Sequence, residues 1–534
     1  MVARKDSHTP LKRNLSLFSM VMAVITSTIG SGWLFAPYFA AQLAGPASLL
    51  SWGLAGVMAY ALALVFAELG ALVSSSGSLA QIPLLSHGRL SGFIGGWSAW
   101  IAYVTLPSIE VMATMDYLSS TFPVLTQHSD GEQVLSATGL GLSVALLAAF
   151  AWINLAGVVW LARWINGLTL WKLLIPVLAS VTLMFTAAHW QNLSPFLPAA
   201  IEDSSGVLRA MSAGGILFSL LGFRTAMDLA GEAKDPQRTV PLAMALGLGI
   251  SLAIYLLLQL AFLVAVPPEQ LGAGWNRIFF EGHGGPLVAI AAGLGLTWVI
   301  SLLIIDAAVS PSATSMAYMG AAARVNWMMG RSALLPAVFG RTNRAGVPSV
   351  AVLSSLVVGV VMLLLPGGWS GAVSFLTAAL IIALSMGPVC LWALRRQLPQ
   401  RHRPYRLPFS RTWCVVSFVM GSWAAFWNGW DTLLFAVLAI VLPSLIFLYV
   451  EWRRGRPVQF WSGAWWFAYL GGLCIVAGLF GDDRPFMLPL AWQLTVVGAF
   501  AVVIFPFAVR SRLDCVAPEA ALMMDTDARP AHDA

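Results

Sequence analysis

The stretch TSTIGSGWLFAPY, residues 26–38, interrupts an apolar segment that is otherwise long enough to cross a lipid bilayer. Gly30, Ser31 and Gly32 stand in its middle, and a glycine inside a helix costs about 1 kcal/mol relative to alanine. Within a membrane, backbone groups that lose their helical partners cost several kcal/mol more unless protein, water or a ligand satisfies them. The sequence therefore predicts a membrane helix that is interrupted here for a functional reason.

The composition of the whole chain is that of a membrane protein. Of its 534 residues, 59% are hydrophobic and 10% are charged, and the mean hydropathy is +0.81. A water-soluble core of this size could not bury so much apolar surface, so a bilayer must surround most of the chain. The net charge of +6 does not indicate a nucleic-acid partner, because the basic residues lie at the ends of apolar segments, as membrane-topology signals do.

Apolar runs of membrane-spanning length recur along the chain and predict an all-α integral membrane protein. Fourteen spans are predicted, with twelve or thirteen as alternatives because the boundary near residues 428–431 is weak. Their approximate ranges are 16–42, 46–73, 92–122, 136–158, 164–188, 209–231, 241–266, 287–320, 348–366, 371–394, 412–430, 432–451, 461–480 and 487–510.

The charges of the loops predict the orientation of the chain. An even number of spans places both termini on one side, and the loops expected on that side hold most of the basic residues, whereas the opposite loops are mainly acidic. Since positive loops face the cytoplasm, both termini are predicted to be cytoplasmic. The first set is Arg89, Arg163, Lys234, Arg238, Arg324, Arg331, Arg341, Arg344, Arg395, Arg396, Arg401, Arg403, Arg406, Arg411, Arg453, Arg454 and Arg456, and the second is Asp130, Glu132, Glu202, Asp203, Glu269, Glu281, Asp482 and Asp483, with the cations Arg209, Arg277 and Arg484.

Motifs of enzymes, metal sites and cofactor sites are missing from the sequence. The four cysteines, Cys390, Cys414, Cys474 and Cys515, form no CxxC pair, so neither a disulfide framework nor a metal site is predicted. We find no HExxH, no Ser/His/Asp grouping and no phosphate-binding glycine loop. The sequence therefore predicts no catalytic residue, metal or cofactor.

A second interruption occurs in the sixth predicted span. Gly222 falls in mid-span, Arg224 follows it, and Asp228 and Glu232 precede the next loop. In many secondary transporters, two discontinuous helices related by an internal inverted repeat carry the substrate site. If spans one to five and six to ten are the repeats, the two interruptions fall in the first helix of each.

This pairing favours an unwound helix at residues 30–32 over the simpler explanation of close helix packing. Small residues let helix backbones approach each other, but that packing motif has a spacing of four, and Gly30 and Gly32 are two apart. In the unwound helix, the second half begins near Gly32. Its free N–H groups and positive dipole end would then face an anion.

Four stretches resemble motifs of the amino acid–polyamine–organocation (APC) superfamily. They are GSGWLF at 30–35, FAELGALVSSSGS at 66–78, LLGFRTAMDLAGEAKDPQRTVPLAM at 220–244 and RPYRLP at 403–408, and the resemblance covers about residues 15–450. Within the superfamily, GSGWLF, SHG, IEV, GFRTAMDLAGEAKDPQRT and LLLQLAFLVAVP look closest to bacterial aspartate:proton symporter-like members. Arg224 departs from the general pattern, since most relatives have Glu there.

The resemblance implies a LeuT-type fold with two inverted five-helix repeats, broken first and sixth helices and extra C-terminal helices. The implied organisation is a cytoplasmic segment 1–15, a first repeat 16–188, a second repeat 209–394, C-terminal helices 412–510 and a disordered cytoplasmic tail 511–534. It also implies a multi-pass protein of a bacterial-type inner membrane.

The resemblance further implies how the two breaks would bind an amino acid. The α-carboxylate would meet the N–H groups of Ser31 and Gly32, with Gly30 giving room. The carbonyls left free at the two breaks would accept the α-ammonium, and Phe218 aligns with an aromatic residue that closes over the substrate in relatives. These carbonyls belong to Thr28, Phe218 and Leu221, which flank the breaks at Gly30 and Gly222.

Ionisable residues at membrane depth are functional candidates, because they are costly there and need partners. The planar guanidinium of Arg224 suits a substrate side-chain carboxylate; alternatively Arg224 pairs with a neighbouring carboxylate or acts as a gate. Glu110, in the third span, could pair with Arg224, carry the coupled proton or bind a cationic substrate. Asp116 lies nearer the outer end and is interpreted as an interfacial or structural charge.

Lys172, in the fifth span, has two interpretations. It could extend to the cytoplasmic surface, or it could reach toward the first and eighth helices and take the place of a sodium ion, as in some proton-coupled relatives. Protonation of Lys172 would then replace sodium in coupling. Asp306, in the motif IIDAAVSPSATS, is a candidate partner of Lys172 or pairs elsewhere.

Together these observations predict a secondary active amino acid transporter that is coupled to protons and takes acidic amino acids such as aspartate or glutamate. The main alternative is an exchanger of neutral or cationic amino acids or polyamines, because symport and antiport use the same site. A membrane-embedded enzyme or a receptor is a remote alternative. The expected partners are an amino acid, protons and the lipid bilayer, not nucleic acid, and the sequence leaves the oligomeric state open.

Overall fold

The computed structural model describes residues 15–73, 77–129, 132–156, 158–196, 205–230, 233–280, 285–343, 346–364, 367–481, 484 and 486–516, without the side chains of 128–133 and 157–166. Every structural statement below concerns these residues. The predicted charges that fall outside the described positions and side chains are Asp130, Glu132, Arg163, Glu202, Asp203, Glu232, Glu281, Arg344, Asp482 and Asp483, and the N-terminal residues 1–14 and the tail from 517 are outside as well.

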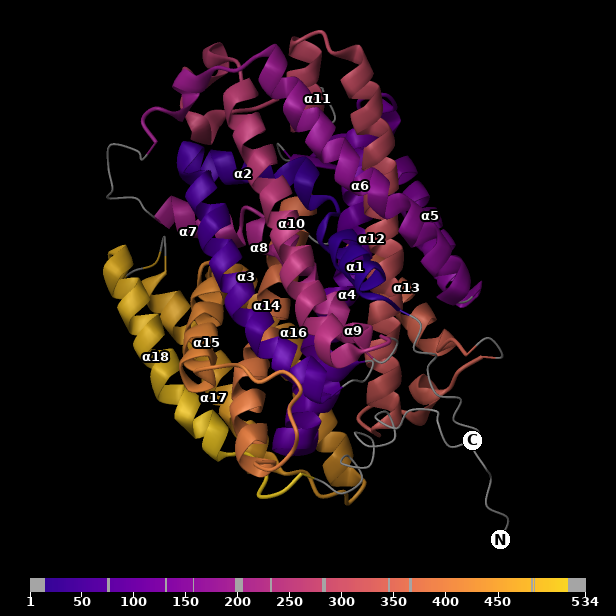
Figure 1. Ribbon diagram of the computed structural model, residues 1–534, viewed down its shortest axis with the longest axis vertical. Helices are drawn as coiled ribbons and strands as arrows, with labels where there is room; N and C mark the ends of the chain where they lie inside the picture. The colour runs from indigo at the N-terminus through magenta and orange to yellow at the C-terminus, as the bar shows by residue number, and fades with distance from the viewer. Residues whose placement is uncertain are drawn as a thin grey trace.

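The described chain is almost entirely helical (Figure 1). Its α-helices are α1 Leu17–Thr28, α2 Gly32–Ala44, α3 Ser48–Leu72, α4 Ser78–Leu118, α5 Ala137–Ala156, α6 Val158–Thr186, α7 Ser205–Ser212, α8 Ile216–Leu220, α9 Thr225–Asp228, α10 Pro236–Ala265, α11 Pro286–Gly293, α12 Thr297–Arg331, α13 Ser349–Met362, α14 Gly368–Gln397, α15 Ser410–Phe426, α16 Trp430–Arg453, α17 Phe460–Phe480 and α18 Leu490–Arg510. Short 3-10 helices include η1 Gly45–Ala47, η2 Pro123–Leu125, η3 Trp190–Leu193, η5 Leu221–Arg224, η7 Pro268–Leu271, η8 Trp275–Arg277 and η9 Ala337–Gly340.

The helices confirm the all-α membrane fold. Each predicted span coincides with one or more described helices, and nine helical segments of the described chain are long and apolar enough to cross a membrane. A tenth results if the bent pair of α7 with Ile216–Asp228 forms one span. The weak boundary before Trp430 is a true helix end, because Gly429 between α15 and α16 has a φ of 85°.

One local expectation was wrong. The eighth span, predicted at 287–320, is divided into α11 and α12, and α12 continues to Arg331. Gly295 between them has a φ of +69°, a left-handed conformation that ends a helix; hydropathy continues across this turn and does not reveal it. The loop before α5 also holds a short hairpin, in which β1 Thr126–Ser129 pairs antiparallel with β2 Glu132–Leu135.

The two interrupted spans lie together in the centre of the molecule. The last turn of α1 packs against η5 and α9, and α10 packs against α1 and α3. The long helix α4 packs against both α12 and α14, which places it at the core of the bundle. The C-terminal helices α15, α17 and α18, drawn from orange to yellow, gather on one side of this core (Figure 1).

A kink in α4 lies against the C-terminal helices. Gly88 has a φ of 82°, so residues 78–87 form a separate short helix before the long remainder of α4. His87 Nε2 lies 2.9 Å from the carbonyl oxygen of Ala508 on α18. The N–H of Leu513 donates to the carbonyl of Ser86 at 2.9 Å. The C-terminal helices are therefore fixed to the central bundle by these polar contacts.

The motif residues Glu68 and Arg403 meet in a buried ion cluster. Glu68, near the end of α3, is fully buried and accepts two hydrogen bonds from Arg395 of α14, at 2.9 and 2.6 Å. Arg403 lies 3.2 Å from the same carboxylate, and the N–H of Leu407 donates to it at 2.8 Å. The loop that contains RPYRLP is thereby held against the end of α3.

Replacing Glu68 should lower stability strongly. Glu68→Gln leaves the partly buried Arg395 and Arg403 without their counter-charge, and breaking a buried ion pair typically costs about 3–5 kcal/mol. We expect a clearly lower Tm for the purified protein in detergent.

The matched control is Arg484→Gln, because Arg484 pairs at 2.9 Å with Asp431, whose side chain is 82% exposed. Exposed pairs contribute about 0–1 kcal/mol, so this variant should keep nearly the wild-type Tm. Equal Tm changes in the two variants would contradict the structural importance of the Glu68 cluster.

Candidate substrate and coupling site

The first break lies where the sequence predicts it. α1 ends at Thr28 and α2 begins at Gly32, so three residues separate the two helices. The carbonyls at the end of α1 have lost their helical partners, and hydroxyl groups from other helices replace them. Tyr255 of α10 donates to the carbonyl of Thr28 at 2.9 Å, and Tyr318 of α12 lies 3.4 Å from that of Ser27. Buried backbone acceptors are thereby satisfied, as a membrane interior requires.

The carboxylate of Glu110, a residue of α4, lies at the N-terminal end of α2. Its Oε2 accepts a hydrogen bond from the N–H of Ser31 at 2.6 Å, and the side chain is buried. A methyl group added at Gly30 would overlap the Glu110 carboxylate, so only glycine allows this approach. The other oxygen, Oε1, has no hydrogen-bond partner. The N–H group and the helix dipole that were predicted to bind a substrate carboxylate therefore bind a carboxylate of the protein itself.

The second break differs in detail from the prediction. The sharp bend of the sixth span, 51°, lies between α7 and Ile216, at residues 213–215, and not at Gly222. Gly222 lies within η5, where the α-helix tightens into a 3-10 turn before Arg224 and α9. The local sequence shows a helix-weakening glycine at both places, and tertiary packing determines which one bends.

Gly222 has a packing role instead. A methyl group there would overlap the carbonyl carbon of Ser27 and the backbone nitrogen of Thr28. The 3-10 turn therefore rests directly on the broken end of α1, and the absence of a side chain at Gly222 brings the two interrupted spans into contact.

Two of the three carbonyls expected to accept a substrate ammonium, those of Thr28 and Phe218, already have donors. Thr28 accepts from Tyr255, and the carbonyl of Phe218 accepts from the N–H of Leu221. A carbonyl oxygen has two lone pairs, so each retains capacity for one further donor. Phe218 and Leu221 are both buried beside the break.

Arg224 is buried without a hydrogen-bond partner. Its three guanidinium nitrogens have no acceptor, and the side chain is 2% exposed. The guanidinium carbon lies 4.0 Å from the ring centre of Tyr103 and 5.4 Å from that of Tyr318. Asp228 accepts a hydrogen bond from the Tyr103 hydroxyl at 3.1 Å. Arg224 thus forms no ion pair with Glu110 or with any other described carboxylate, and two aromatic faces hold the cation.

Lys172 points inward, toward the broken end of α1. Its Nζ donates to the carbonyl of Thr26 at 2.9 Å and to the hydroxyl of Thr314 on α12 at 2.6 Å. The side chain is fully buried, so it does not extend to the surface. A cation at a helix C-terminus is favoured by the helix dipole, and Lys172 joins α1, α6 and α12 at one point.

Asp306 forms its hydrogen bonds with neutral donors instead of Lys172. Its Oδ2 accepts from the indole of Trp33 at 3.1 Å, and its Oδ1 accepts from the indole of Trp171 and the hydroxyl of Ser310, both at 2.7 Å. The direct Lys172–Asp306 hydrogen bond that the sequence offered as one alternative is therefore not formed.

Trp369 of α14 covers the beginning of α2, and sequence reasoning missed it. Its indole donates to the hydroxyl of Ser31 at 2.9 Å. Its ring centre lies 4.9 Å from that of Phe35, 5.5 Å from Phe39 and 6.0 Å from Phe218. The chain contains 23 tryptophans, and no local motif separates this one from those expected at membrane interfaces.

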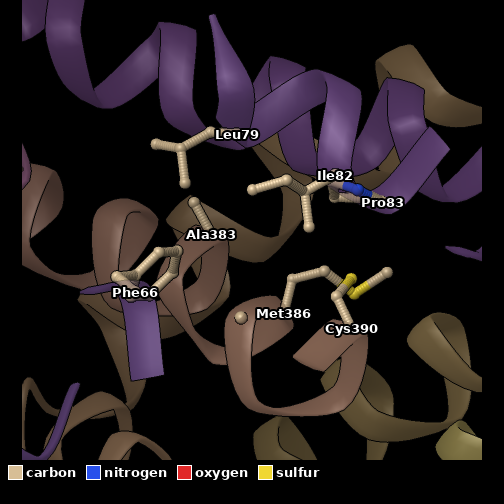
Figure 2. Close-up of a pocket in the computed structure, with 8 residues that line it drawn as sticks. Phe66, Leu79, Ile82, Pro83, Ala383, Met386 and Cys390 are labelled. Atoms are coloured by element: carbon tan, nitrogen blue, oxygen red, sulfur yellow. The ribbon is translucent and has the colours of Figure 1, made fainter. Parts of the chain in front are cut away.

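A small cavity lies away from the two breaks. It is lined mainly by apolar side chains of α3, the first part of α4 and α14 (Figure 2). Figure 2 shows Phe66, Leu79, Met386 and Cys390 directed toward it. The residues around the breaks are buried as well, so the candidate substrate site is closed in this structure.

Comparison with known proteins agrees with this architecture. The sequence profile of the amino acid permease family matches residues 15–432. The glutamate/serine transporter AimA of Bacillus subtilis is 31% identical over 512 residues, covering 94% of each chain. The aspartate-proton symporter of the same species is 30% identical over 510 residues, covering 92% of this chain and 95% of that protein. The human cationic amino acid transporter 4 is 29% identical over 304 residues, covering 53% of this chain and 46% of that protein.

The chain therefore belongs to the amino acid permease family, within the APC superfamily that its motifs resemble. The broken helices, the long apolar spans and the match over most of the chain identify the same class of protein. The roles of the individual site residues stay predictions, which the contacts and burial of these residues make testable.

Adding a side chain at Gly222 should push the 3-10 turn η5 away from the end of α1. Gly222→Ala places a methyl group against the backbone of α1, and such overpacking typically costs about 1–3 kcal/mol. We expect a lower Tm together with a large loss of amino acid uptake by proteoliposomes.

Gly53→Ala serves as the control, because a methyl group at Gly53 in α3 meets nothing within 4 Å. It should keep full uptake, with a Tm equal to or above that of the wild type, since alanine favours helices by about 1 kcal/mol. Unchanged uptake by Gly222→Ala would contradict the importance of this contact.

Proposed function

We propose that this protein is a proton-coupled transporter of acidic amino acids, glutamate and aspartate. The observation that carries the proposal is Arg224, a buried cation at the end of the 3-10 turn η5, whose guanidinium nitrogens have no hydrogen-bond acceptor. The names of the two Bacillus relatives, a glutamate/serine transporter and an aspartate-proton symporter, support the same substrate class.

Asp228 attracts the Arg224 guanidinium electrostatically but forms no hydrogen bond with it, so the guanidinium nitrogens are free to bind another anion. Burying an ion without hydrogen bonds is costly, and the rings of Tyr103 and Tyr318 compensate part of that cost. A carboxylate can form two parallel hydrogen bonds with the guanidinium plane. The side-chain carboxylate of glutamate or aspartate is an anion of the required geometry, and Arg224 would select it.

Glu110 supplies a reason for proton coupling. The N–H of Ser31 donates to its Oε2, and a substrate α-carboxylate has to take over that donor. An ionised Glu110 and an anionic substrate would repel each other in a medium of low dielectric constant. A proton on Glu110 removes the repulsion and weakens its hold on Ser31, so one proton and one substrate enter the site together.

Lys172 would take part in coupling through the end of α1. It bridges α1 and α12 as a cation through Thr26 and Thr314. Loss of its proton leaves a neutral amine that still donates hydrogen bonds but no longer balances the negative end of the α1 dipole. We assign to it the function that a bound cation performs in an ion-coupled transporter, namely to set the stability of the contact between the two helices.

The alternatives predict different behaviour. A serine-like substrate would use the same backbone groups without Arg224, and an exchanger would use the same site without a net proton flux. Membership of the permease family favours transport over an enzyme or a receptor. The arginine-rich loops favour an inner-membrane protein with both termini cytoplasmic.

Neutralising Arg224 tests the substrate class. Arg224→Gln should lower glutamate and aspartate uptake by about tenfold or more, because a hydrogen bond between charged groups typically contributes about 1.5–3 kcal/mol. Serine uptake, if present in the wild type, should change far less. The measurement is radiolabelled uptake into proteoliposomes with an inward proton gradient, using each amino acid separately.

Arg331→Gln is the matched control, since Arg331 also stacks on an aromatic ring, that of Trp327, but at the end of α12. It should leave all uptake rates near wild type. Glutamate and aspartate uptake at wild-type affinity in Arg224→Gln would refute the acidic-substrate proposal, and uptake of no amine-containing solute by the wild type would refute transport.

Neutralising Lys172 tests the coupling. Lys172→Met should abolish accumulation driven by a pH gradient and leave counterflow exchange of substrate intact, because the substrate contacts remain while the titratable cation is lost. Lys234→Met, which removes an exposed lysine, should retain both activities. If Lys172→Met still accumulates substrate at the wild-type level under a pH gradient, the proposed role of Lys172 in coupling is contradicted.

A further inference from the structure

The buried carboxylate of Asp306 is used by neither the substrate contacts nor the Lys172 bridge. It lies on α12 and is fully buried. Its donors come from three helices: Trp33 of α2, Trp171 of α6 and Ser310 of α12 itself. No cation of the described residues is hydrogen-bonded to it: three neutral donors hold the carboxylate, and Lys172 attracts it electrostatically without direct contact.

The two carboxylate oxygens of Asp306 have different hydrogen-bond partners. Oδ1 accepts from both Trp171 and Ser310, at 2.7 Å each, which fixes the carboxylate to α6 and α12. Oδ2 accepts from Trp33 alone, at 3.1 Å. The carboxylate is thus anchored on one side and presents its other oxygen to α2. The Trp33 contact can break without disturbing the other two.

Trp33 is the second residue of α2, directly after Gly32. The helix begins with the N–H groups that were assigned to the substrate carboxylate, and the residue before it, Ser31, is bonded to Glu110 and Trp369. A hydrogen bond to Trp33 therefore fixes the position of these donors relative to α12. On α6, the other indole belongs to the neighbour of Lys172, so the same carboxylate also contacts the helix of the coupling residue.

We propose that Asp306, Trp33 and Trp171 form a latch that holds the first turn of α2 over the substrate site and releases it when the site opens. Asp306 and both indoles are positioning residues, because they act on the substrate through Ser31 and Gly32. The substrate assignment of this latch rests on the proposed function, whereas its effect on α2 does not.

The geometry specifies what opening changes. In alternating access, one bundle of helices moves relative to the other around the site. α2 can separate from α12 only if the Trp33 bond breaks, and it can separate from α4 only if the Tyr117 hydroxyl also releases the carbonyl of Leu34. A hydrogen bond to a charged acceptor is about twice as strong as a neutral one. The latch therefore favours the closed position of α2, and its loss should increase the population of the open one.

A single engineered cysteine reports this movement. Phe35 lies on α2, is 8% exposed and packs edge-on against Tyr117 of α4 with ring centres 5.3 Å apart. Phe35→Cys, in a background with Cys474→Ser and Cys515→Ser, is labelled with a membrane-impermeant maleimide in proteoliposomes without substrate. The labelling rate measures how often the start of α2 moves away from Tyr117 of α4 and from Trp369 of α14, which both cover this position.

Removal of the latch should raise this rate. Trp33→Phe and Asp306→Asn, each introduced into the reporter background, should increase it by about tenfold or more, as expected for a lost hydrogen bond to a charged group. The double variant should be labelled no faster than the faster single variant, because both changes remove the same bond. The KM for substrate should rise in each.

Two matched controls remove equivalent groups elsewhere. Trp423→Phe deletes an indole that donates to the carbonyl of Leu494 at 3.0 Å between α15 and α18. Asp431→Asn neutralises an exposed carboxylate paired with Arg484. Both should leave the labelling rate unchanged. If Asp306→Asn does not give folded protein, Trp33→Phe alone decides the test.

The result separates the latch from the proposed function. A labelling rate of Trp33→Phe equal to that of Trp423→Phe, or additive effects in the double variant, would overturn the latch while acidic uptake could persist. Faster labelling combined with no preference for acidic amino acids would support the latch and refute the substrate assignment, since the labelling assay contains no substrate.

Discussion

A helix that stops in mid-membrane exposes backbone groups, and these groups must find partners away from water. At the end of α1 the partners come from three different helices: Tyr255 of α10, Lys172 of α6 and Thr314 of α12. The break is therefore a junction, because the free carbonyls of one helix hold its neighbours together. The charge on Lys172 and the position of α1 are coupled by these contacts.

The opposite side of the break has a complementary arrangement. The beginning of α2 offers N–H groups, and Glu110 accepts from Ser31 in the closed structure. Donors on one side and acceptors on the other suit an amino acid, whose two ends carry opposite charges. The unpaired Arg224 adds a third, cationic element. A zwitterion with an additional carboxylate could satisfy all three, whereas any of the protein's own groups satisfies them only in part.

Much of this architecture could be predicted from local patterns. The apolar runs gave the helices, and the glycines of residues 30–32 located the first break, because a helix-weakening glycine in a membrane needs compensation. The interruption of the sixth span was predicted at Gly222, where the α-helix does give way to the 3-10 turn η5, but the sharp bend of the span lies at residues 213–215, since several glycines are available there. The division of α11 from α12 was missed because hydropathy averages over a single left-handed glycine at position 295.

Residue chemistry and spacing were enough to identify a membrane protein, its interrupted helices and the ionisable residues inside it, because these follow from properties of the local chain. The partners of those residues depended on contacts between segments far apart in sequence. Glu110 accepts a hydrogen bond from Ser31 and does not pair with Arg224, whose guanidinium lies against two tyrosine rings. Asp306 accepts hydrogen bonds from Trp33 and Trp171 and not from Lys172. The spacing of residues in the sequence does not predict these hydrogen-bond partners. They depend on which helix faces meet when the bundle packs, because every buried polar group bonds to a donor or acceptor that packing brings close.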